Sequence, residues 1–160
     1  APEIDETPGK AELPRMLALR LARAKAAAVA ADSYVLAADT VVACGRRVLP
    51  KAEDEGTARR CLALLSGRRH QVFTAVVVRA PDGRVAERVA ESAVTFARLT
   101  EAQLQAYLDG GEWRGKAGGY AIQGLAARHI RALSGSYSNV VGLPLFETAQ
   151  LLRGLGYLHP

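Results

Sequence analysis

Asp39 is the residue whose chemical type fits its surroundings least well. It lies in the segment YVLAADTVVA, residues 34–43, which is short, apolar and rich in valine, as is typical of a buried strand. A buried aspartate loses its hydration unless a cation pairs with it or it binds a metal ion. The alternative is a strand-end aspartate that bonds nearby backbone, and Asp39 with Thr40 taken alone favours that alternative. The surrounding residues therefore decide whether Asp39 has a chemical role.

Three lysines could bring positive charge to the same place. Lys25 stands among small residues in ARAKAAAV, which leaves space around its ammonium group for a phosphate. Lys51 follows the turn expected after Asp39, and Lys116 lies in a glycine-flanked loop, where glycine permits close approach of backbone to a ligand. Each of them is also compatible with an ordinary solvated lysine. Together they indicate binding of a small polyanion.

Gln123 is a polar residue at the end of a short apolar segment, AIQG, residues 121–124. Its amide offers both a donor and an acceptor and could therefore recognise the edge of a nucleobase. The alternative is an amide satisfied within the core.

The hydrophobic pattern predicts helices and strands that alternate irregularly. We expect helices over residues 13–31, 53–66, 101–110 and 145–155, and strands over 34–43, 71–80, 84–99, 121–124 and 126–133. A turn over residues 44–46 leads into a further short strand that ends at Leu49. Pro81-Asp82-Gly83 is typical of a hairpin turn, and Thr100 of a helix N-cap. Because hairpins occur beside helices, the fold class is α/β with a mixed twisted sheet flanked by helices. The length of 160 residues predicts a single domain, residues 1–160.

Composition excludes several classes of function. The net charge is +5, but the arginines are scattered, so no nucleic-acid partner is expected. The three histidines lack zinc-site spacing, and no apolar run could span a membrane. The two isolated cysteines suit a reducing compartment, and we expect the cytoplasm.

Several segments, taken in order along the chain, resemble the Maf family. They are DET, RLARAKA, LAADTVV, LLSGRRHQVFTAV, VTFARLT, WRGKAGGYAIQG and GSYSNVVGLPL, and they extend from about residue 5 to 155. The resemblance implies an α/β fold shared with inosine-triphosphate pyrophosphatases, with a cleft between two lobes. It also implies hydrolysis of a nucleoside triphosphate between the α- and β-phosphates, with a divalent metal cation, Mg²⁺ or Mn²⁺.

The resemblance also implies roles for individual residues. Asp39 matches the family's proton acceptor, and Glu6 matches an acidic residue of the metal site, to which Asp39 could also belong. The positions matching substrate-binding residues are Lys25 and Lys51 for the triphosphate, Thr40 and Gln123 for nucleotide preference, and Lys116 in the adjoining motif. Whether Asp39 orients water, deprotonates it or binds the metal stays open. The Ile-Gln-Gly form resembles the branch that acts on dTTP, UTP and modified pyrimidine nucleotides.

The chain departs from the family pattern in two places. Pro50-Lys51-Ala52 stands where Gly-Lys-Pro is common, which leaves the geometry around Lys51 open. The family's first strand and its Ser-x-Ser-Pro-Arg-Arg loop have no counterpart in the 160 residues. We therefore expect these residues alone to lack an arginine clamp and to hydrolyse dTTP poorly.

Two functions from different classes follow from the resemblance. The first is a house-cleaning pyrophosphatase, and the second is a non-catalytic regulator of septum formation that binds a partner. Presence of Glu6, Asp39, Lys25 and Lys51 together favours catalysis. The family contains homodimers, so a homodimer is one expectation, although the residues themselves leave the oligomeric state open.

Overall fold

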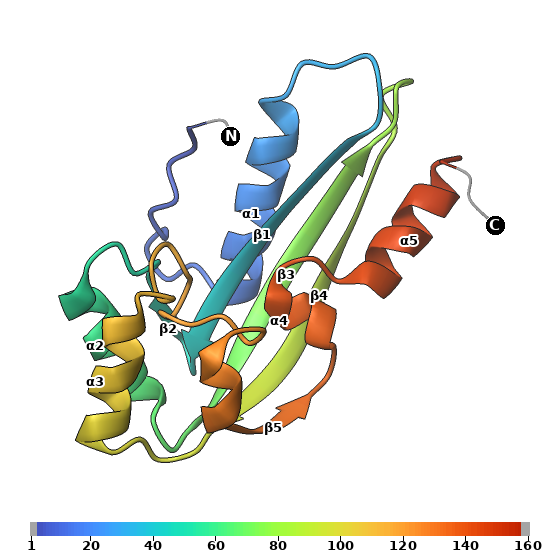
Figure 1. Cartoon of the computed structure of the whole chain (residues 1–160). Helices are drawn as coiled ribbons and strands as arrows, with labels where there is room; N and C mark the ends of the chain where they lie inside the picture. Colours follow the sequence, from blue (N-terminus) through green and yellow to red (C-terminus); the bar gives the residue numbers. More distant parts are fainter. Residues whose placement is uncertain (1–2, 158–160) are drawn as a thin grey trace.

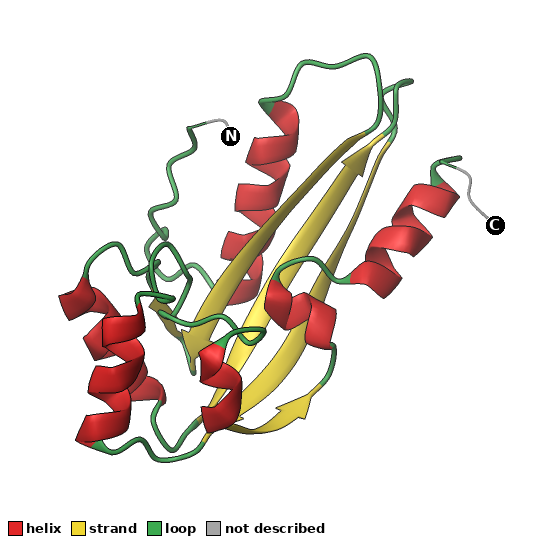
Figure 2. Cartoon of the chain, viewed as in Figure 1, coloured by secondary structure: helices red, strands yellow, loops and turns green. Residues whose placement is uncertain are grey.

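A five-stranded sheet with the order β2-β1-β3-β4-β5 runs through the computed structural model, which describes residues 3–157. Figure 1 shows the elements in sequence colours, and Figure 2 shows helices lying along the sheet. The strands are β1 Val35–Cys44, β2 Arg47–Leu49, β3 Arg69–Arg79, β4 Val85–Phe96 and β5 Ile130–Ser134. The helices are α1 Pro14–Ala27, α2 Glu55–Leu65, α3 Glu101–Gly110, the 3₁₀ helix η1 Leu125–His129, α4 Tyr137–Val141 and α5 Leu145–Gly154.

The α/β class is confirmed, but the strand pairing differs from the mixed sheet that we expected. Every neighbouring pair among the described strands is antiparallel. Two of the four pairings are hairpins, because β2 follows β1 and β4 follows β3 after tight turns that reverse the chain. The turn before β4 contains Gly83 at φ +91°, as the Pro-Asp-Gly sequence predicts.

Helices cover both faces of the sheet, since side chains of β3 alternate between two buried clusters. Phe73, Ala75 and Val77 pack with α1, whereas Val76 and Val78 pack with α5 on the opposite face. This burial on both faces explains why the middle of β3 is a continuous apolar run rather than an alternating one.

A second group of helices lies at the end of the sheet where β1 finishes. Figure 1 shows α2 and α3 side by side there, away from α1 and α5. Their buried residues form one cluster with Phe96 of β4 and with Trp113, Tyr120 and Ile122. These last three residues belong to the loop over residues 111–124 that joins α3 to η1, which we call the connecting loop. These two groups of helices are consistent with the two lobes that the family resemblance implies.

Helix limits differ modestly from those predicted. The first helix ends at Ala27 rather than near residue 31. Arg79 of β3 donates hydrogen bonds to the carbonyl of Ala26 in its last turn and to that of Val29 just beyond it, so these carbonyls are satisfied at the helix end. The predicted Thr100 cap is confirmed, as its hydroxyl accepts from the Gln103 amide at 3.1 Å.

The strand predicted over residues 121–124 is wrong. Those residues form a turn closed by a 3.1 Å bond from the Gly124 amide to the Ala121 carbonyl, and η1 follows directly. Of the predicted strand 126–133, only the part from Ile130 belongs to β5. Ile122 is buried in the cluster that contains α2 and α3. The segment is therefore apolar because it packs against helices, and not because it forms a strand.

One long edge of β1 has little strand pairing. On the side away from β3, only Val42, Ala43 and Cys44 pair with β2, and within residues 3–157 no strand lies beside residues 35–41. Among the helices described, none is long and apolar enough to cross a bilayer.

Candidate active site

Asp39 lies in the middle of β1 and is 6% exposed. Its carboxylate accepts a hydrogen bond from the Lys25 ammonium group, which projects from the last turn of α1. Burial raises the pKa of Asp39, and the neighbouring Lys25 charge acts in the opposite direction. The desolvation expected for this aspartate is therefore offset by a lysine that lies fourteen positions earlier in the chain.

Glu6 connects the two lysines nearest Asp39. One of its oxygens lies 3.0 Å from Lys25 Nζ, and the other lies 2.7 Å from Lys51 Nζ. The bond from Lys51, with that from Lys25, holds the pKa of Glu6 below its usual range. Although burial opposes it, the bonds to Asp39 and Glu6 raise the pKa of Lys25. Asp39, Lys25, Glu6 and Lys51 thus form a chain of alternating charge, which we call the ion-pair chain.

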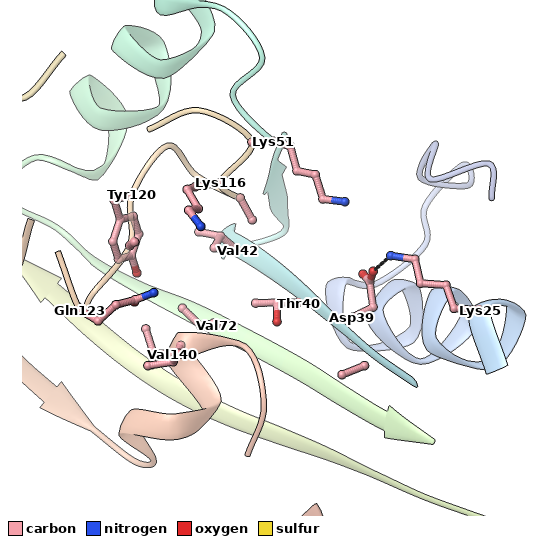
Figure 3. A pocket seen from close by; sticks show the side chains of 15 residues that line it. Lys25, Asp39, Thr40, Val42, Lys51, Val72, Lys116, Tyr120, Gln123 and Val140 are labelled. Carbon is pink, nitrogen blue, oxygen red and sulfur yellow. Dashed lines mark hydrogen bonds and ion pairs between the residues drawn. The ribbon is translucent and has the colours of Figure 1, made fainter. Parts of the chain in front are cut away.

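A cavity of about 270 Å³ extends from the ion-pair chain to the connecting loop. Figure 3 shows Lys25 and Asp39 at one end, Thr40 between, and Lys116, Tyr120 and Gln123 at the other end. Its lining includes six of the seven predicted site residues: Lys25, Asp39, Thr40, Lys51, Lys116 and Gln123. Glu6 lines an adjoining cavity of about 400 Å³ that shares Asp39, Thr40 and Lys51 with the first.

The two ends of the cavity lie on different faces of β1. Successive strand residues point to opposite faces, so Asp39 faces α1 whereas Thr40 faces α4. Thr74 Oγ1 donates to the Asn139 carbonyl at 2.9 Å and lies 2.8 Å from Thr40 Oγ1. Because a carbonyl can only accept, the proton of Thr74 is committed to Asn139, and Thr40 must be the donor to Thr74. Thr40 therefore offers only lone pairs to the cavity.

Backbone hydrogen bonds bring Lys51 and Lys116 onto adjacent segments. The Ala52 amide donates to the Lys116 carbonyl at 3.0 Å, and the Gly118 amide donates to the Pro50 carbonyl at 3.1 Å. A proline at position 52, common in the family, has no amide proton and could not make the first of these bonds. This departure therefore adds a bond that fixes the Lys116 loop.

Glycine is required where this loop touches β1. Gly118 has φ +70°, and a Cβ atom there would lie 2.9 Å from Cγ1 of Val42. The backbone of the loop thus passes directly over the strand that carries Asp39 and Thr40.

Some residues around the cavity were missed from the sequence. Tyr120, Val72, Val140 and Val141 line it, and His70 contacts Tyr120 from β3. His70 is the second residue of β3, which begins at Arg69. A tyrosine and valines within apolar segments look like ordinary core residues, so only the fold shows that they border a cavity.

Glu6 and Asp39 are the carboxylates that could hold a divalent cation. No group of three or more histidine, cysteine or acidic residues suited to a metal occurs within the part of the chain that the structure describes. Mg²⁺ commonly uses only one or two protein carboxylates and completes its coordination with water and substrate phosphates. Two carboxylates that converge on one Lys25 ammonium group fit that donor set.

The fold and the cavity define an α/β protein with a charged site for a small anionic ligand. The family model described as Maf-like protein matches residues 1–155, and this chain belongs to the Maf family.

Relatives that match over most of their own length support the same assignment. A protein of Granulibacter bethesdensis is 64% identical over 98% of this chain and 82% of its own length. One from Paramagnetospirillum magneticum is 64% identical over 96% of this chain and 83% of its own length. A third, from Gluconobacter oxydans, is 65% identical over 95% and 73%. Each of these relatives is named a dTTP/UTP pyrophosphatase.

Proposed function

We propose that this protein hydrolyses dTTP, UTP and modified pyrimidine nucleoside triphosphates to the monophosphate and pyrophosphate, in a cytoplasmic house-cleaning role. The observation that carries the proposal is the ion-pair chain at one end of a cavity whose other end holds Gln123. The names of the relatives support the same reaction. A homodimer is compatible with the proposal and is not required by it.

The lysines bind the triphosphate in this proposal. Lys25 and Lys51 lie beside Asp39 and can bind neighbouring phosphates, whereas Lys116 lies with Gln123 at the other end of the cavity. Positive groups fixed before the reaction stabilise charge that develops on the departing pyrophosphate. Since Glu6 already binds Lys25 and Lys51, phosphate oxygens must compete with its carboxylate.

Asp39 is the proton acceptor for the attacking water. Its burial raises its pKa, which brings a carboxylate closer to the proton affinity that a general base needs near neutral pH. The water attacks the α-phosphorus, the bond from that phosphorus to the bridging oxygen breaks, and pyrophosphate leaves. A divalent cation held by Glu6 and Asp39 would neutralise phosphate charge and lower the pKa of water.

Thr40 and Gln123 bind the nucleoside. Thr40 can accept a hydrogen bond, and the exposed side chain of Gln123 can both donate and accept. Gln123 lies at the opposite end of the cavity from Asp39, with Thr40 between them, so base recognition by Gln123 lies away from the ion-pair chain.

The test is pyrophosphate release by the full-length gene product from dTTP, UTP, dCTP, dATP and dGTP, with Mg²⁺ or Mn²⁺. We expect release from dTTP and UTP, and a decrease of about a hundredfold or more in kcat for Asp39→Asn, since a general base contributes that much. Asp82→Asn is the matched control, because Asp82 lies in the exposed turn before β4, where it pairs with Arg84, and it does not line the cavity. Absence of metal-dependent release from every nucleotide would contradict the proposal and favour the non-catalytic regulator.

A further inference from the structure

His70 and Tyr120 form a buried hydrogen bond at the base end of the cavity. His70 is fully buried on β3, and its Nε2 atom lies 2.6 Å from the Tyr120 hydroxyl oxygen. Phe96 stacks against His70 with ring centres 5.7 Å apart and meets Tyr120 edge-on at 5.0 Å. Both rings are therefore held in fixed orientations.

Tyr120 borders the space in which a ligand would lie. It is 6% exposed and lines the cavity together with Gln123. In Figure 3 the Tyr120 hydroxyl and the Gln123 amide lie at the same end of the cavity. Within residues 3–157, His70 is the only hydrogen-bond partner of the Tyr120 hydroxyl. A phenol can donate once and also accept, so one capacity of this hydroxyl is left for a ligand.

The location of the protons decides which capacity is left. Burial lowers the pKa of His70 to about 4, so the ring is neutral near pH 7 and carries one N–H. His70 Nδ1 is buried and has no partner among the described residues. Interiors tolerate unpaired N–H donors least, so the proton belongs on Nε2, which donates to Tyr120. The hydroxyl proton of Tyr120 is then free to donate.

We propose that Tyr120, held by His70, is a specificity-determining residue that donates a hydrogen bond to a carbonyl oxygen of the pyrimidine base, beside the Gln123 amide. This inference rests on the proposed function and deepens it. Uracil and thymine have carbonyl oxygens on both sides of the N3–H group, whereas cytosine has an amino group in place of one of them. A donor that faces this amino group is left unpaired, and such mismatches give strong discrimination.

The principal test is Tyr120→Phe in the full-length gene product, with kcat and KM measured for dTTP, UTP and dCTP. We expect KM for dTTP and UTP to rise about tenfold, because one hydrogen bond to the base is lost, while kcat stays nearly constant. We expect the KM for dCTP to stay nearly constant, so the discrimination between dTTP and dCTP falls by the same factor. The inhibition constant of inorganic tripolyphosphate, which has no base, stays unchanged.

Two further sets of variants separate recognition from folding. Tyr107→Phe is the matched control, because Tyr107 is a second buried tyrosine, lies on α3 and does not line the cavity. His70→Gln retains an N–H donor and is expected to keep the low KM for dTTP, whereas His70→Leu raises it as Tyr120→Phe does. Equal losses for dTTP and dCTP, or a parallel loss of tripolyphosphate affinity, would overturn the proposal.

Binding of dTMP and dCMP by calorimetry tests base recognition without turnover. We expect dTMP to bind more tightly than dCMP, and this preference to shrink in Tyr120→Phe. If the unaltered protein released no pyrophosphate but showed a preference for dTMP that shrank in Tyr120→Phe, the proposed function would fail and base recognition by Tyr120 would stand. If the preference did not change in Tyr120→Phe, the inference would fail whatever the turnover.

Discussion

Asp39 and Thr40 are adjacent in the chain, yet they bond to opposite sides of the sheet. Asp39 pairs with Lys25 of α1, whereas Thr40 donates to Thr74, whose own proton goes to the Asn139 carbonyl in α4. The cavity reaches both residues at the part of β1 where residues 35–41 have no strand neighbour on one side within the described chain. The two residues therefore connect the proposed phosphate end with the proposed base end.

Lys25→Met is expected to lower kcat/KM for dTTP about tenfold to a hundredfold, the range for lost charge-assisted bonds. The Lys25 charge lowers the pKa of Asp39, so its removal raises that pKa further. The acidic limb of the pH profile of kcat/KM consequently moves to higher pH. Arg23→Met is the control, since Arg23 also lies on α1 but pairs with Glu87 away from the cavity. An unmoved acidic limb would show that Asp39 is not the group that titrates.

Glu6→Gln separates two effects of one carboxylate. Without divalent cations, we expect the affinity for inorganic tripolyphosphate to rise by about threefold, because partly exposed ion pairs with Lys25 and Lys51 contribute less than about 1 kcal/mol. With Mg²⁺, we expect kcat/KM for dTTP to fall, since a metal ligand is lost. Calorimetry and pyrophosphate release measure the two effects. Glu12→Gln is the control, because Glu12 pairs with Arg20 and not with Lys25 or Lys51. If tripolyphosphate bound Glu6→Gln no more tightly than the unaltered protein, Glu6 would not compete with phosphate for the two lysines.

Stability should fall as the pH decreases from about 6.5 to about 4. The unfolded chain protonates His70 near 6.5, whereas burial lowers the pKa in the folded state to about 4. The unfolded state thus binds more protons in this window, and the free energy of unfolding decreases with falling pH by up to about 3 kcal/mol. Urea denaturation at pH 7, 5.5 and 4 measures the change. His70→Leu should show a shallower dependence over the same window, and an identical dependence would contradict the assignment.

Gly118→Ala should destabilise the fold and weaken nucleotide binding together. The left-handed φ costs any other residue about 1–2 kcal/mol, and the new Cβ would also collide with Val42. Gly45→Ala is the matched control, because Gly45 has φ +61° and open space around it. We expect urea denaturation to show a larger loss for Gly118→Ala, with a raised KM for dTTP. If both variants lost the same free energy of unfolding, the side chain of Val42 would be able to move aside at no cost.

Local signals in the sequence predicted much of the fold correctly. The Pro-Asp-Gly turn, the Thr100 cap and the final helix after Pro144 depend on residues close together in the chain, so their chemistry is visible in sequence. The strand predicted over residues 121–124 failed because Ile122 is buried against helices rather than in a sheet. The strand pairing is decided by contacts between distant segments, and a mixed sheet was therefore expected where an antiparallel one occurs.

The sequence by itself determined which groups are present and, through the alternation along a strand, that Asp39 and Thr40 face opposite ways. Only the tertiary structure decided their partners. Glu6 and Asp39 converge on Lys25, and His70 meets Tyr120 from fifty positions away. Ion pairs and hydrogen bonds act over a few ångströms, whereas the residues that make them are separated along the chain by whole strands and helices. Folding alone brings them within that range.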